Sequence, residues 1–170
     1  RGLGDVYKRQ LEEDLAIAAR PATLPAGVRF KPIRVSPLVF IEPIETADPM
    51  PSRLPPDERE AWAEVPMILA AGGIARRRVD AWFRQLDVTP KIYAQVAGNE
   101  AIVSMVSLGL GLGVVPKIVL DNSPHAERVR VLEVDPVLEP YELGLFTLKR
   151  NLHNPLVDAF WSLLPDEVDQ

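Results

Sequence analysis

Two glycine-containing stretches of the sequence have residue types suited to binding a small anion. Gly72 and Gly73 end the apolar run 65–71, and Gly98 follows the alternating segment 91–97. Each stretch precedes a segment with helical periodicity, and the first turn of a helix presents unpaired backbone N–H groups and a partial positive charge. A carboxylate is the kind of group that such helix starts bind. The candidate ligand-binding residues are Gly72, Gly73, Ile74, Arg76, Gly98, Asn99 and Glu100.

Each stretch also has a purely structural interpretation. An Asn at a helix start, such as Asn99, commonly only caps the helix, and Gly72 and Gly73 can serve only to turn the backbone. The two stretches support a ligand site jointly, because parallel strands place the helix starts that follow them at one edge of a sheet.

Three consecutive arginines, Arg76, Arg77 and Arg78, lie in the first of these helical segments. Consecutive residues fan around roughly 200° of a helix, so at most one or two of them can face a ligand. Arg76 is nearest to the helix start, and we assign it to the site. For the run as a whole, a solvated or paired surface face is the favoured interpretation.

The remaining polar residues form no recognisable catalytic or metal site. His125 lies among turn residues and His153 precedes the last helical segment, and neither has the spacing of a metal ligand. Ser104 and Ser107 lack the context of an activated nucleophile. The carboxylates are scattered, so no acid and base pair can be assigned. The sequence predicts no catalytic residue, no metal, no cofactor and no enzymatic activity.

Composition narrows the class of protein further. The 170 residues are 47% hydrophobic, carry a formal net charge of -5 and include no cysteine. An acidic chain without a basic stripe is poorly suited to bind nucleic acid by itself, because duplex binding depends on neutralising phosphates. The absence of cysteine excludes disulfides and is compatible with the cytosol. No apolar run reaches the length of a membrane span, so no membrane partner is predicted.

The middle of the chain alternates between strands and helices. Residues 65–71 have the pattern of a buried strand, 74–86 of an amphipathic helix, 91–97 of a strand, 99–108 of a helix and 112–115 of a short strand. This alternation predicts an α/β fold in which a parallel sheet is covered by helices.

Three later glycines, Gly109, Gly111 and Gly113, do not make a dinucleotide-binding loop. That motif joins a strand to the helix after it, whereas these glycines follow a helix. We interpret them as a helix stop and a tight entry into the next strand.

Prolines mark two crossings between two lobes, at 43–56 and 135–140. Strand patterns at 14–19, 28–43 and 141–149, with a closing helix that begins after Asn154 and Pro155, belong outside the middle region. We therefore predict an incomplete first lobe at 11–43 plus 141–165 and a second lobe at 44–140 that includes both crossings. Residues 1–10 are interpreted as a non-native junction and 166–170 as a tail.

Five segments resemble the effector-binding domain of LysR-type transcriptional regulators. They are D-L-A-I-A (14–18), R-R-R-V-D-A-W-F-R (76–84), G-N-E-A-I-V-S-M-V-S-L-G-L-G (98–111), L-D-N-S-P (120–124) and L-V-D-A-F-W-S-L-L-P (156–165). The resemblance runs from about Asp14 to Pro165 and is greatest to the activators of the ketol-acid reductoisomerase gene. It implies a two-lobe fold like that of type 2 periplasmic binding proteins, with the first strand and helix of the first lobe missing here.

The resemblance also implies regulation of branched-chain amino-acid biosynthesis by a small metabolite. For that branch of the family the effector is acetolactate or acetohydroxybutyrate, whose carboxylate would suit the helix starts at Gly73 and Gly98. Members of the family bind DNA as homodimers or tetramers in the cytoplasm, through an N-terminal helix-turn-helix that is absent from these residues.

Two other functions share the predicted architecture. An extracytoplasmic solute-binding protein has the same two lobes without a DNA partner, and a small α/β enzyme can be built on a similar fold. The enzyme is the weakest alternative, because the sequence shows no assembled acid, base or nucleophile.

Overall fold

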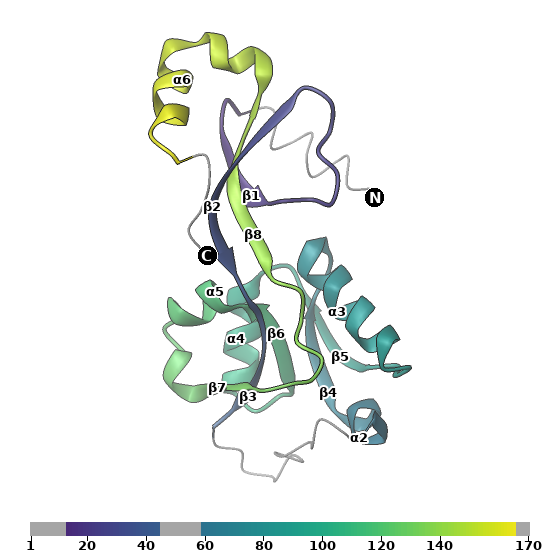
Figure 1. Ribbon diagram of the computed structural model, residues 1–170. Coiled ribbons are helices and arrows are strands. Elements are labelled where there is room, and N and C mark those ends of the chain that lie inside the picture. The colour runs from purple at the N-terminus through teal and green to yellow at the C-terminus, as the bar shows by residue number, and fades with distance from the viewer. Residues whose placement is uncertain (1–12, 45–58, 166–170) are drawn as a thin grey trace. The chain divides into compact units, whose positions relative to one another are not determined.

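The computed structural model describes residues 13–44 and 59–165 (Figure 1). The predicted junction at 1–10, the tail at 166–170 and most of the first proline-rich crossing lie outside these residues. No helix in the described ranges is both long and apolar enough to span a bilayer.

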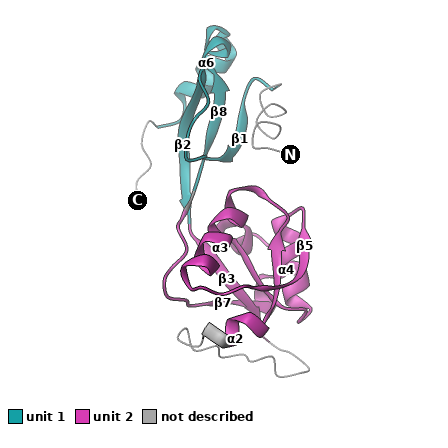
Figure 2. Cartoon of the chain, turned by 90° about the vertical axis from the view of Figure 1, so that its right-hand side faces the viewer, with its two compact units in different colours: residues 1–36, 141–170 teal, residues 37–140 magenta. Residues whose placement is uncertain are grey.

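The chain folds into two compact units (Figure 2). Unit 1 contains residues 1–36 and 141–170, and unit 2 contains residues 37–140. The units meet at 36/37 and 140/141, whereas the proline pattern had indicated 43/44 and 140/141. The difference arises because the strand that follows Pro37 pairs with strands of unit 2 and with none of unit 1.

Unit 1 is built on a three-stranded antiparallel sheet with the order β1-β8-β2. Its elements are β1 (Ala16–Ala19), β2 (Val28–Ser36), β8 (Tyr141–Leu148), the 3-10 helix η2 (Lys149–His153) and α6 (Pro155–Ser162). The register of β2 against β8 shifts between Pro32 and Arg34, where proline removes a ladder donor. The predicted start of α6 is confirmed, since the Asn154 side chain accepts a hydrogen bond from the Leu156 amide at 3.0 Å.

Unit 2 holds the strand and helix alternation predicted from the sequence. Its elements are β3 (Leu38–Pro43), α2 (Arg59–Glu64), β4 (Pro66–Ala70), α3 (Gly73–Gln85), β5 (Lys91–Val96), α4 (Asn99–Ser107), β6 (Leu112–Pro116), α5 (Lys117–Asp121), the 3-10 helix η1 (Ala126–Arg128) and β7 (Val129–Leu132). The short helices α2 and α5 were not foreseen. Gly109 follows α4 with φ 77°, as a helix stop requires.

The five-stranded sheet of unit 2 has the order β5-β4-β6-β3-β7. Strand β4 is parallel to both β5 and β6, as predicted. Strand β3, which was predicted to belong to the first lobe, joins this sheet antiparallel to both β6 and β7, so the sheet as a whole is mixed. Strand β3 enters directly from unit 1 instead of following a helix, so no crossover sets its direction.

Helices α3 and α4 cover opposite faces of this sheet. Phe40 on β3 packs against Trp82 and Phe83 of α3, with ring centroids 4.8 and 6.3 Å away. The next residue, Ile41, lies in the buried cluster that contains Ile102 of α4. Adjacent residues of a strand point to opposite faces, so the two helices sandwich the sheet.

Candidate functional site

The two glycine stretches lie at one edge of the sheet in unit 2. Strands β4 and β5 are parallel neighbours, and the pairing continues past their ends, where the Ala71 amide donates to the Val96 carbonyl at 2.8 Å. Helices α3 and α4 begin directly after these two strands. The helices depart to opposite faces, so their first turns flank the shared edge, which is the arrangement at which open α/β sheets bind ligands. We call this edge, formed by residues 71–74 and 97–100, the rim.

The backbone of the rim is open to solvent within unit 2. A Cβ added at Gly72, Gly73 or Gly98 would meet no atom within 4 Å. Gly73 has φ 90°, which requires glycine. Gly98, by contrast, has the extended conformation φ -160°, ψ 140°, which any residue adopts. Neither the backbone conformation of Gly98 nor its neighbours in unit 2 therefore require a glycine at this position. The close approach of a ligand to the backbone would require one.

The backbone N–H groups at both helix starts are left without a side-chain cap. Gly72 is the N-cap of α3 and Gly98 the N-cap of α4. The expectation that Asn99 caps α4 is corrected, because Asn99 is the first residue inside the helix. Half-buried Ile74 and Asn99 lie on the first turns. The rim thus presents two sets of amide donors with partial positive charge.

Arg76 lies at the rim but is already paired. Its Nε is 2.8 Å from the Asp80 carboxylate, and its Nη1 donates to the Ala70 carbonyl at 3.0 Å and to Gln95 Oε1 at 3.2 Å. Only 17% of the side chain is exposed. Arg76 therefore ties the ends of β4 and β5 to α3, and its contact with a ligand stays a prediction.

Glu100 is exposed, and its carboxylate already has a partner in unit 2. Its Oε2 accepts a hydrogen bond from the Ser123 hydroxyl at 3.1 Å, and Ser123 is buried. An acidic residue on the first turn stabilises the helix through its dipole and lowers the affinity of the same turn for an anion. The geometry favours a positioning role for Glu100 over direct contact with a carboxylate.

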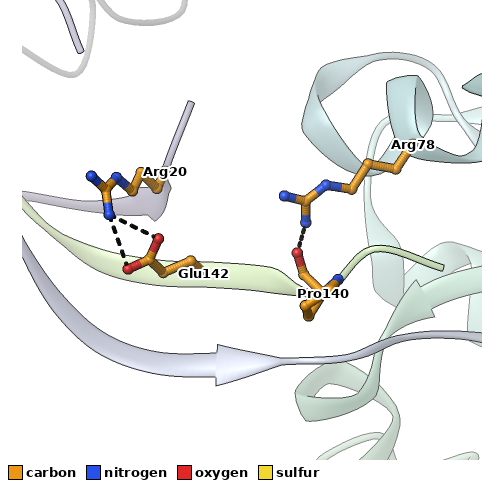
Figure 3. A network of polar contacts seen from close by, with 4 residues as sticks. All are labelled: Arg20, Arg78, Pro140 and Glu142. Atoms are coloured by element: carbon orange, nitrogen blue, oxygen red, sulfur yellow. Dashed lines mark hydrogen bonds and ion pairs between the residues drawn. The ribbon is translucent and has the colours of Figure 1, made fainter. Parts of the chain in front are cut away.

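The role of Arg78 was not predicted from the sequence. Arg77 is exposed as the favoured surface interpretation implies, but the Arg78 side chain is 18% exposed, and its Nε lies 3.2 Å from Glu139 Oε2. Figure 3 shows its guanidinium also donating to the Pro140 carbonyl. No local pattern could have revealed this pairing, since the partners are separated by 61 and 62 residues.

The other polar candidates do not assemble into a reactive centre. His153 is exposed in η2, and the backbone amide of His125 donates to Ser123 Oγ at 3.3 Å. The Ser107 hydroxyl donates to the Ser104 carbonyl within α4. In the ranges that the structure describes, no three His, Asp or Glu side chains come together to hold a metal ion.

Sequence comparison relates nearly the whole chain to one protein family. The family described as "LysR substrate binding domain" matches residues 5–169. The chain is 45% identical over 159 residues to the HTH-type transcriptional activator IlvY of Salmonella typhimurium, covering 91% of this chain and 53% of that protein. IlvY of Escherichia coli is also 45% identical over 159 residues, covering 91% of this chain and 52% of that one. The chain thus spans about half the length of these relatives.

Solved structures of regulator domains share the fold. The effector binding domain of QuiR in complex with shikimate has a TM-score of 0.72 and 25% sequence identity, covering 94% of this chain and 73% of that chain. The cofactor-binding domain of the Cbl transcriptional regulator has a TM-score of 0.77 and 20% identity, covering 99% and 74%.

Proposed function

Because the chain belongs to the LysR substrate binding domain family, we propose that it senses a small carboxylate metabolite for a transcriptional regulator of branched-chain amino-acid biosynthesis. Its 45% identity to IlvY activators supports this pathway over the other uses of the fold. It likewise favours gene regulation over solute capture outside the cell, since those relatives are named as transcriptional activators.

The proposed effector is a compact 2-hydroxy-3-keto acid, acetolactate or acetohydroxybutyrate. The observation that carries this proposal is the hydrogen bond between Ala71 and Val96, which brings two uncapped helix starts to one open edge. Amides from both starts can donate to the two oxygens of a carboxylate. That the solved effector domain of QuiR holds shikimate, another small hydroxylated carboxylic acid, agrees with this ligand class.

We propose the following arrangement for the whole regulator. DNA binding is assigned to a helix-turn-helix N-terminal to this segment, because the acidic chain itself lacks a basic stripe. The regulator acts in the cytoplasm as a homodimer or tetramer, and the segment described here contributes the effector response.

Calorimetric titration of the 170-residue chain with each hydroxy-keto acid tests the proposal. Gly98→Ala places a methyl group at the open rim, so we expect it to weaken binding by about 1.5–3 kcal/mol through lost charge-assisted hydrogen bonds. The melting temperature should stay unchanged, since the new methyl group meets no neighbour. Asn99→Ala should weaken binding in the same direction.

The matched control is Ser162→Ala, a similarly small change at an exposed position of α6 that should leave affinity unchanged. Absence of heat with both acids, or equal affinity for the parent chain and Gly98→Ala, would refute the proposed ligand site.

A further inference from the structure

The segment 135–140 has no helix or strand, yet it is held firmly against α3. The Trp82 indole N–H donates to the Pro136 carbonyl at 2.5 Å, and the Leu138 side chain is 6% exposed. One helical turn before Trp82, Arg78 binds the next part of the segment. Residues four apart lie on the same face of a helix, so one face of α3 binds the segment near both of its ends, at Pro136 and at Glu139 and Pro140.

Arg78 makes several contacts with two consecutive residues. Its Nε lies 3.2 Å from the Glu139 carboxylate, while its Nη1 donates to the Glu139 carbonyl at 3.3 Å and to the Pro140 carbonyl (Figure 3). The planar guanidinium can serve several acceptors at once and is charged at every physiological pH. Pro140 is the last residue of unit 2, so Arg78 binds the chain at the point where it leaves the unit.

The first turn of α3 forms part of the rim. Gly72 and Gly73 begin the helix, and Arg76 ties this turn to Ala70 and Gln95. Farther along, buried Val79, Trp82 and Phe83 pack the helix against the sheet. A single rigid helix therefore links the amides of the rim to the segment 136–140.

On the far side of Tyr141 the chain is held again, within unit 1. The Arg20 guanidinium lies 3.2 Å from a carboxylate oxygen of Glu142, and the Arg20 amide donates to the Glu142 carbonyl at 2.8 Å. Residues 140 and 142 are thus each bound to their own unit by an arginine (Figure 3). Only Tyr141 stands between the two anchored residues.

We propose that Arg78 is a positioning residue that couples the segment 136–140 to α3, so that the segment moves when the helix moves. A ligand that binds at the rim therefore changes the environment of the crossing at Tyr141. The step from ligand to α3 rests on the proposed function. The step from α3 to the crossing rests on the Arg78 and Trp82 contacts alone, and the two steps can be tested separately.

The first test needs no ligand and uses amide NMR spectra of the 170-residue chain. Arg76→Gln releases the first turn of α3 from Ala70 and Gln95, and we expect it to shift the amide resonances of Val137, Leu138, Glu139 and Tyr141. In an Arg78→Gln background, the shift changes that Arg76→Gln causes should be less than about a third as large as in the parent chain. Such non-additivity is expected of coupled residues.

The second test adds acetolactate and follows the same resonances. In the parent chain, amides of the rim and of 137–141 should shift with one common midpoint. In Arg78→Gln the rim amides should still respond, with a midpoint within about threefold of the parent, while those of 137–141 no longer follow them. A general loss of structure would instead alter both groups.

Two further variants control for charge and folding. Arg77→Gln removes the same charge from an exposed neighbour and should behave like the parent chain. Arg78→Lys keeps the charge but replaces the planar guanidinium by a single donor nitrogen, and it should restore part of the response.

The outcomes separate the two steps. Equal shifts from Arg76→Gln in both backgrounds, or an undiminished ligand response of 137–141 in Arg78→Gln, would overturn the role of Arg78. Coupling in the ligand-free test without any response of the rim to acetolactate would refute the proposed effector and leave the role of Arg78 standing.

Discussion

The two units differ in how completely their apolar side chains are buried. In unit 2, Phe40, Ile41 and Ile68 are 0% exposed, and helices cover both faces of the sheet. In unit 1, Leu156 and Leu163 of the closing helical region are 81% and 78% exposed, and Ile17 on β1 is 67% exposed. Among the described residues, the largest fully buried side chains all lie in unit 2, so the more complete core belongs to that unit, whereas unit 1 leaves much apolar surface exposed.

This contrast teaches where precise geometry can be maintained. The rim depends on the registry of β4 and β5 and on two helices that pack on opposite faces of one core. A close-packed core has low compressibility, so it resists small displacements of the strands and helices that form it. The candidate ligand site therefore lies on the unit whose own core can hold it in place.

The test with the largest expected loss of stability compares a phenylalanine in each unit. Phe83 on α3 is 1% exposed and Phe160 on α6 is 49% exposed. We expect Phe83→Ala to lower the free energy of unfolding by about 3–5 kcal/mol and Phe160→Ala by less than about 1 kcal/mol. Urea unfolding followed by circular dichroism measures both. Equal losses would mean that α6 is packed as tightly as α3.

A second test compares glycines in the two sheets. An added Cβ would overlap Ile102 and Val106 at Gly113 in unit 2, and the Phe30 ring at Gly144 in unit 1. Gly113→Ala and Gly144→Ala should each cost about 1–3 kcal/mol through overpacking. The thermal midpoint reports the loss, with Gly98→Ala as a neutral control. A neutral Gly144→Ala would extend the loose packing of unit 1 into its sheet.

The smallest expected effect distinguishes two ion pairs. The Glu42 side chain is 7% exposed and accepts a hydrogen bond at 2.7 Å from Nε of Arg130 on a neighbouring strand, whereas the Glu142 side chain is 32% exposed beside Arg20. We expect Glu42→Gln to cost about 1.5 kcal/mol and Glu142→Gln less than about 1 kcal/mol. Denaturation at low and high salt checks this ranking, because salt should reduce only the exposed contribution. The reverse ranking would contradict it.

Local signals in the sequence predicted the elements that form the rim. The apolar run 65–71 contains β4, and the glycine-containing stretches after it and after 91–97 became the starts of α3 and α4. These assignments succeeded because a buried strand, a glycine and an amphipathic period act over a few residues. Once these elements are placed, the strand order β5-β4-β6 determines which face of the sheet each of the two helices covers.

Features that depend on distant partners could not be predicted in this way. The antiparallel direction of β3 is set by pairing with β6 and β7, and its own pattern does not differ between the two directions. Arg78 resembled a solvated arginine because Glu139 is 61 residues away. Helix α5, with five residues, is too short to show a helical period.

The ladder between β2 and β8 has a topological consequence. Strand β2 ends at Ser36 and β8 begins at Tyr141, and these two residues are antiparallel partners. Such strands are ordinarily joined by a turn of about two residues. In this protein the whole of unit 2 takes the place of that turn, as a contiguous insertion whose two ends meet. The complete rim therefore lies on one unbroken stretch of chain, residues 37–140, that leaves and rejoins the unit 1 sheet at paired strand ends.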